Sequence, residues 1–160
     1  MVEKIKKAKK KIMIDLDVVT TAIWDKKRES LEFLERVKKG EFSVYTPFAI
    51  LDTLSSWQHE GLKDSIKGFY ELYSTRIISA EEYLEKSSGM KIDGKKVSDD
   101  LAKVGIKEED ALLVVVSAIF GLDAIVTYNR KHLHKNKDII NEILRRHKLN
   151  EICILLPSGL

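Results

Sequence analysis

The chain has 160 residues, 44% of them hydrophobic, with 28 basic and 25 acidic side chains and a formal net charge of +3. This length suits one compact domain over residues 1–160, and the near balance of charge excludes a strongly cationic, histone-like protein. No apolar run approaches the roughly 18 residues of a membrane span, and residues 1–10 form a basic leader without the apolar segment of a secretory signal. We therefore expect a cytoplasmic protein without membrane association, whose leader is frayed.

The first quarter of the chain alternates short apolar runs with amphipathic segments. Lys11–Asp15 predicts a strand, and Val18–Trp24 shifts to helical spacing. A second helix is predicted over Glu29–Lys39 and ends at Gly40. Phe42–Tyr45 then predicts the second strand.

Two helices are predicted to follow this strand. The first carries Asp52 and begins at Thr46 and Pro47, as N-cap and first helical residue. The second is amphipathic and follows Gly61. Its buried side is predicted to comprise Ile66, Phe69, Tyr70, Leu72 and Tyr73.

The middle of the chain contains the third predicted strand, Arg76–Ser79. Ser79 and Glu82 have the spacing of a capping box, which predicts a helix after that strand. Residues 90–96 are expected to form a loop, and Ser98–Val104 a short helix.

A long apolar segment runs from Ala111 to Phe120. Three acidic residues precede it, and acids favour the first turn of a helix. Gly121 stands where a helix commonly ends. The segment therefore predicts a central helix that is buried on most sides and opens with Glu108, Glu109 and Asp110.

The last part of the chain predicts a fourth strand at Asp123–Thr127, an amphipathic helix at Asp138–His147 and a fifth strand at Glu151–Leu155. The single cysteine, Cys153, lies in this last strand, where a buried thiol is expected. A lone cysteine forms no internal disulfide, which is typical of a reducing compartment.

Strands that alternate with helices predict an α/β protein: a three-layer α/β/α sandwich with a mainly parallel five-stranded sheet. Ligands of such sheets bind beyond the carboxyl ends of the strands. Asp15 and Asn129 follow predicted strands, while Asp52 and Asp110 lie in helices that can reach the same edge. Oxygen ligands of this kind suit Mg²⁺ or Mn²⁺.

Other interpretations of these acids remain open. Asp15 is equally suited to cap the following helix, and Asp17 competes with it for both roles. We prefer Asp15 as the metal ligand and Asp17 as a cap or outer contact. Glu108 or Glu109 takes the place of Asp110 if the helix has a different phase.

A basic cluster beside Asn129 is a candidate for contacts to RNA phosphates, although a solvated loop has the same composition. It comprises Arg130, Lys131, Lys135 and Lys137. His132 and His134 lack the spacing and the cysteine partners of a zinc site. Trp24 and Trp57 are more typical of a core or a dimer interface than of a base-stacking surface.

Three segments resemble the PIN-domain nucleases, which include toxin ribonucleases of prokaryotic toxin–antitoxin pairs. They are MIDLDVV near the start, TPFAILD with its acid five residues after the proline, and EEDALLVVVSAIFGLDAIVTYNRKHL. The resemblance makes Asp15 and Asp110 metal ligands. It places Asp52 where most members have Glu, and Asn129 where many have Asp, with His132 three residues later as in one subset. Thr127 corresponds to a hydroxyl residue that often lines the site.

The resemblance implies a metal-dependent ribonuclease that hydrolyses RNA with a metal-activated water. It names Mg²⁺ or Mn²⁺ as cofactor, Asp15, Asp52, Asp110 and Asn129 as catalytic and metal-binding residues, and Thr127, Arg130, Lys131 and His132 as substrate contacts. It also implies an antitoxin partner and a homodimer formed through Asp52–Trp57 and the helix after Gly61.

Two alternatives stand beside the nuclease. The short Asp52 and the neutral Asn129 favour a catalytically weakened module of PIN fold that binds RNA or a partner. A phosphoryl-acceptor domain would share the acids at the strand ends, but it needs a lysine at the end of a late strand, and no convincing one is present.

Overall fold

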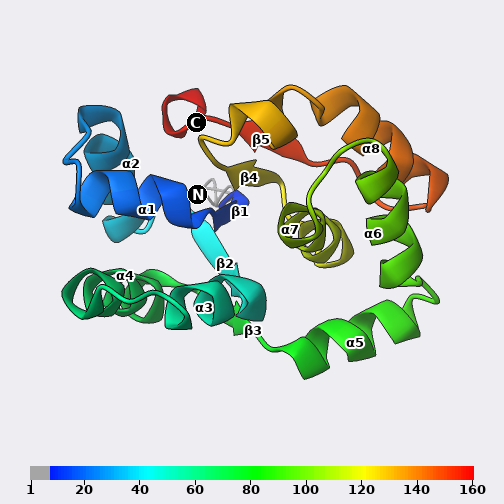
Figure 1. Ribbon diagram of the computed structural model, residues 1–160, viewed down its shortest axis with the longest axis horizontal. Coiled ribbons are helices and arrows are strands. Elements are labelled where there is room, and N and C mark those ends of the chain that lie inside the picture. Colours follow the sequence, from blue (N-terminus) through cyan, green and yellow to red (C-terminus); the bar gives the residue numbers. More distant parts are fainter. Residues whose placement is uncertain (1–7) are drawn as a thin grey trace, which may run out of the picture.

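The computed structural model describes residues 8–160, and one five-stranded sheet, parallel throughout, lies at its centre (Figure 1). The strands follow the order β3-β2-β1-β4-β5. Their bounds are Lys11–Ile14 (β1), Ser43–Pro47 (β2), Arg76–Ile78 (β3), Ala124–Val126 (β4) and Cys153–Leu155 (β5). The fraying expected for the basic leader concerns mainly residues 1–7, which lie outside the described residues.

Helices cover both faces of the sheet (Figure 1). One side holds α1 (Leu16–Ile23), α2 (Arg28–Lys38) and α4 (Glu60–Tyr73), and α3 (Phe48–Ser55) packs against α4. The other side holds α6 (Gly94–Lys103), α7 (Glu108–Ile119) and α8 (Lys137–Arg146), and α5 (Ala80–Gly89) packs against α7. The predicted three-layer sandwich is confirmed.

The core lies on both faces of the sheet, between the central strands and α7 on one side and α1, α2 and α4 on the other. Ile12, Met13 and Ile14 of β1 are fully buried, as are Ile125 and Val126 of β4. Parallel strands that are covered on both faces read as continuous apolar runs, which explains why these strands were recognisable in the sequence. Truncation of one such side chain to alanine costs about 2–5 kcal/mol of stability.

The central helix and one helix start agree with the predictions. Helix α7 ends before Gly121, whose φ of +64° favours glycine. Ser79 and Glu82 form the predicted capping box at the start of α5. Both signals are local, so neighbouring residues alone determined them.

The start of α3 differs from the prediction by one residue. Thr46 and Pro47 belong to β2, Pro47 is the N-cap, and Phe48 is the first helical residue. Thr46 is buried, and its Oγ1 lies 2.6 Å from Oγ of Ser74. The threonine hydroxyl therefore joins β2 to the end of α4 and does not cap α3.

The loop predicted for residues 90–96 is partly helical, because α6 already begins at Gly94. Asp93 is the N-cap, and its carboxylate accepts hydrogen bonds from the backbone N–H groups of Lys95 and Lys96 at 3.1 and 3.4 Å. A Cβ at position 94 would lie 2.1 Å from the hydroxyl of Tyr83. The absence of a side chain at Gly94 therefore allows α5 and α6 to approach each other.

Two side chains that were predicted to be buried are exposed. Leu72 is 72% exposed, because α4 buries Ile66, Phe69 and Tyr70 and position 72 lies off that stripe. Cys153 is exposed because β5 is an edge strand and turns Ile154, not Cys153, toward the core. Trp24 is also 59% exposed and is not a core residue.

Two short helical turns were not predicted: a π-helix at Arg130–His134 (η1) and a 3₁₀ turn at Pro157–Gly159 (η2). Within residues 8–160, no helix is both long and apolar enough to cross a bilayer.

Candidate metal centre

The carboxyl ends of β1 and β4 meet at one edge of the sheet. The two strands pair in register, Ile14 beside Val126, and the backbone N–H of Asp15 donates to the carbonyl of Val126 at 3.0 Å. Asp15 and Thr127, the next residue of each segment, therefore lie side by side. Tyr70, buried in α4, donates its hydroxyl to the Ile14 carbonyl at 2.7 Å and fixes the end of β1 from the helical side.

Asp15 is both a helix cap and a member of this group of polar residues. Its Oδ1 accepts from the backbone N–H of Leu16, and its Oδ2 accepts from Oγ1 of Thr127, each at 2.8 Å. Burial raises the pKa of Asp15 and the charge of Asp110 adds to the rise, while the two hydrogen bonds oppose it. A cation beside Asp15 would offset the unfavourable burial of its charge.

Asp110 comes from the first turn of α7 and is held by Asn129. The side-chain nitrogen of Asn129 donates to Oδ2 of Asp110 at 3.0 Å, and its Oδ1 accepts from the backbone N–H of His132 at 3.0 Å. Burial is the main cause that raises the pKa of Asp110, and Glu109 adds to it. Because Asn129 turns its nitrogen toward Asp110, it positions that carboxylate and does not present the oxygen expected of a metal ligand.

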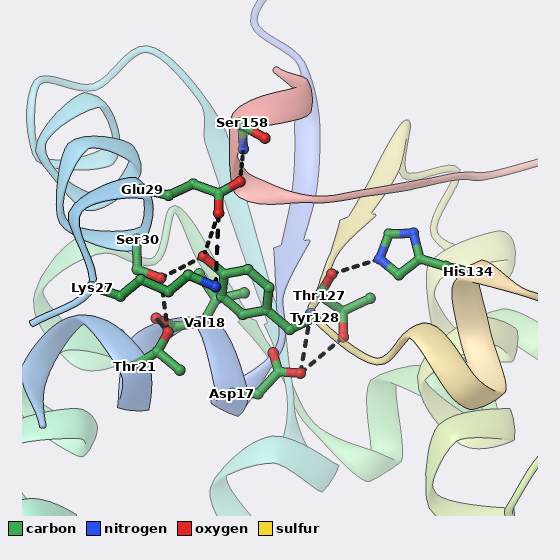
Figure 2. Close-up of polar contacts among 10 residues, drawn as sticks. All are labelled: Asp17, Val18, Thr21, Lys27, Glu29, Ser30, Thr127, Tyr128, His134 and Ser158. Atoms are coloured by element: carbon green, nitrogen blue, oxygen red, sulfur yellow. Dashed lines mark hydrogen bonds and ion pairs between the residues drawn. The ribbon is translucent and has the colours of Figure 1, made fainter. Parts of the chain in front are cut away.

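Asp17 takes part more closely than the sequence suggested. The N-cap of α1 is Asp15, so of the two roles predicted for Asp17, cap or outer contact, the capping role is excluded. Oδ2 of Asp17 accepts from the backbone N–H of Tyr128 at 3.1 Å and lies 3.3 Å from Oγ1 of Thr127 (Figure 2). Its Oδ1 is buried and has no hydrogen-bond partner among the described residues. Burial, together with the charge of Asp15, raises the pKa of Asp17 to about 7.

Tyr128 links this group to α2 and to the C-terminal turn (Figure 2). Its hydroxyl lies 2.7 Å from Oγ of Ser30 and donates to Glu29 at 3.2 Å. Glu29 in turn accepts from the backbone N–H of Ser158 at 3.2 Å, and Nζ of Lys27 lies 4.0 Å above the centre of the Tyr128 ring. No local pattern in the sequence indicated this network, because its members meet only in the folded chain.

A small cavity of about 70 Å³ opens at the acidic edge. Its lining residues come from the β1–α1 junction, from α3 and from α7: Asp15, Leu16, Ala49, Ile50, Thr53, Glu109, Asp110 and Leu113. Asp52 is exposed on α3 and does not line this cavity. The structure therefore brings Asp15, Asp110, Thr127 and Asn129 together, and leaves Asp52 outside the group.

The predicted substrate contacts lie on η1, directly after Asn129. Arg130 and Lys131 are exposed, whereas His132 is half-buried. His132 lies near enough to Asp110 to lower the pKa of that carboxyl group. Nε2 of His134 lies 2.7 Å from the carbonyl of Thr127, so this ring is used to hold the end of β4 (Figure 2).

The donor set fits one hydrated hard cation. Within residues 8–160, no three His, Cys, Asp or Glu side chains are already arranged to hold an ion. Mg²⁺ needs only one or two carboxylates, because it keeps several waters and shares its coordination with substrate phosphates. Asp15 and Asp110 could supply that pair, because both line the cavity, and the unpartnered, buried Oδ1 of Asp17 is consistent with a site that favours added positive charge.

No protein-family model and no curated protein matches the sequence. Among solved structures, this chain is similar to a chain in the crystal structure of VapBC2 from Rickettsia felis, with a TM-score of 0.59. In that structure VapBC2 is bound to a DNA fragment from its own promoter. The match covers 91% of this chain and 98% of that chain at 13% sequence identity. The likeness concerns the fold, and it supports the PIN-like architecture that the sequence motifs implied.

Proposed function

We propose that this protein is a divalent-metal-dependent endoribonuclease of PIN type, with a toxin-like role. One observation carries the proposal. Asp15 and Asp110, which most of the chain separates, line the same small cavity at the carboxyl edge of a parallel sheet. Both carboxylates are partly buried and have raised pKa values, so keeping both charged without a bound cation is energetically unfavourable. Hydrolysis of phosphodiesters is a common use of such a pair.

In this proposal Asp15 and Asp110 hold Mg²⁺ or Mn²⁺. The bound cation would lower the pKa of a coordinated water and neutralise charge on the phosphate. Thr127 keeps the Asp15 carboxylate in place through its hydroxyl, and Asn129 does the same for Asp110 through its amide. These two hydrogen bonds preorganise the acids, so the geometry need not be assembled when RNA arrives.

RNA is the proposed substrate because basic side chains follow the acidic group directly. Arg130 and Lys131 are exposed on η1, and His132 lies beside Asp110. Cations at this place can hold phosphates on either side of the bond that is cut. The net charge of only +3 means that this attraction is local.

The decisive experiment is metal-dependent cleavage of RNA by the wild type, Asp15→Asn and Asp110→Asn. We expect Mn²⁺ to support cleavage by the wild type and each variant to lose at least about 100-fold of the rate. Asp138→Asn, an exposed acid in the first turn of α8, is the matched control and should retain full activity. Equal cleavage by all four proteins would show that a contaminating nuclease is responsible.

A partner-binding module is the second candidate, and a specific surface favours it. A hollow of about 440 Å³ between α1, α2 and α4 is lined mainly by apolar side chains, including Ile23, Leu31, Phe69 and Leu72. Leu72 at 72% exposure and Leu31 at 41% are large apolar side chains to leave in water. A protein that binds a partner through this hollow and does not cleave RNA in the presence of Mn²⁺ would favour this function over the nuclease.

Partners and location follow from the same proposal. A toxin-like ribonuclease acts in the cytoplasm and is held in check by an antitoxin protein. We also propose a homodimer formed through α3, the residues up to Trp57 that follow it, and α4, which are the segments singled out in the sequence. Size exclusion at micromolar concentration should show a dimer, and a monomer would contradict this part.

A further inference from the structure

A metal site of PIN type draws one acid from the helix after the second strand, and in this chain that residue is Asp52. In the structure, Asp52 is exposed and does not line the cavity. The residues of α3 that line the cavity are Ala49, Ile50 and Thr53. Successive helical residues are about 100° apart around the axis, so position 52 points roughly 100° away from the middle of this face. Asp is also one methylene shorter than Glu and cannot reach back.

The opposite wall of the cavity supplies an acid that the sequence motif did not assign. Glu109 lines the cavity together with Asp110 and Leu113 of α7. Glu109 and Leu113 are four residues apart and share one stripe of the helix, so Glu109 lies over the cavity one turn before Leu113. Its neighbour Glu108 points elsewhere and lines a different hollow, together with Tyr83 and Leu112.

We infer that Glu109, and not Asp52, supplies the third carboxylate of the proposed metal site. The inference rests on the proposed function and names a different donor for it. The two acids of α7 then stand next to each other in sequence, and α3 contributes only Thr53 and small or apolar wall residues. The exposed side chain of Glu109 has three rotatable bonds, and it can turn toward an ion held by Asp15 and Asp110 or contact it through a water.

The start of α7 is a favourable place for several acidic side chains. The first turn of α7 carries Glu108, Glu109 and Asp110, and its N-cap, Lys107, makes no side-chain capping bond. Acidic side chains are tolerated there because the helix dipole favours them. A divalent cation between Asp15 and α7 would be attracted by the negative charge of Glu109. This carboxylate would not have to be buried, because the exposed side chain of Glu109 reaches the cavity from solvent.

The test is Mn²⁺ affinity measured by isothermal titration calorimetry on the protein without RNA. We expect Glu109→Gln to weaken binding about 10-fold and Glu109→Asp, which keeps the charge, to weaken it less. Asp52→Asn and the adjacent Glu108→Gln should stay within about twofold of the wild type. Thermal melting followed by circular dichroism checks that each variant is folded, as expected for exposed positions.

Recovery of Mn²⁺ affinity in double variants provides a second test. Position 53 faces the cavity, so Thr53→Glu in the Glu109→Gln background should restore Mn²⁺ affinity, whereas Asp52→Glu in that background should not. The inference is overturned if Asp52→Asn weakens binding as much as Glu109→Gln, or if Glu109→Gln behaves like Glu108→Gln. The proposed function fails separately, if Asp15→Asn and Asp110→Asn leave Mn²⁺ binding unchanged or the wild type binds none.

Discussion

The side-chain nitrogen of Asn129 donates a hydrogen bond to a carboxylate oxygen of Asp110 at 3.0 Å, which joins the segment after β4 to the first turn of α7. A neutral amide at this place satisfies the acid without adding charge. The bond therefore stabilises the acidic edge of the metal-free protein, and it fixes the direction in which Asp110 faces the cavity.

Asn129→Asp should make the stability of the protein depend on metal. Two carboxylates at hydrogen-bond distance repel each other, so we expect a loss of about 1–3 kcal/mol in EDTA and partial recovery in Mn²⁺. Urea unfolding in both conditions measures the difference. Asn136→Asp, which also loses a donor, here to the His132 carbonyl, is the control and should show less dependence on metal.

Thr127 tests whether the Asp15 carboxylate is held by a hydroxyl. Thr127→Val has nearly the same shape but leaves Oδ2 of Asp15 and the backbone N–H of Asn129 without this partner, so it should cost about 1–3 kcal/mol. Thr127→Ser keeps the hydroxyl and should cost less. Unfolding by urea distinguishes them, and a loss in Thr127→Ser with none in Thr127→Val would assign the effect to packing of the methyl group.

Asp17 should make the metal-free protein less stable as pH rises. Its folded-state pKa of about 7 lies above the usual 3.8, so between these values the folded state binds more protons than the unfolded state. The stability from this group is fully present below about pH 4 and is lost as pH rises through 7. The pKa values of Asp15 and Asp110 are also raised and act in the same direction.

Asp17→Asn keeps an acceptor for the N–H of Tyr128 and removes the titration. In EDTA we expect the decline in stability between pH 4 and 8 to shrink by about 4 kcal/mol, because the pKa of Asp17 lies about three units above its usual value and each unit corresponds to about 1.4 kcal/mol. The variant should then be more stable than the wild type at pH 8. Parallel stability curves for the two proteins would contradict the high pKa.

Tyr128 should be coupled energetically to α2. Tyr128→Phe removes the hydroxyl that meets Ser30 and Glu29, at a cost of about 1 kcal/mol. A double-mutant cycle with Ser30→Ala should give a coupling energy of about 0.5–1.5 kcal/mol, measured by urea unfolding. Strictly additive losses would show that the 2.7 Å contact contributes nothing of its own.

The sequence predicted what depends on neighbouring residues and on strand order. The apolar runs predicted all five strands. The rule that ligands bind beyond the carboxyl ends of parallel strands also predicted correctly that Asp15 and Asn129 lie at the same edge of the sheet. The direction of Asp52 was not accessible, because a helix start displaced by one residue turns every side chain by about 100°. Asp17 and Tyr128 meet only through the register of β1 and β4, and no local pattern reports it.

The exposed position of Cys153 affects how any assembly should be interpreted. The chain has one sulfhydryl, and it lies on the outer strand of the sheet, away from α3 and α4. In air, two copies can become covalently linked through it, edge to edge, in a species that resists dilution and disappears with dithiothreitol. An association through the helices persists in reductant, so electrophoresis with and without a thiol distinguishes the two kinds of pair.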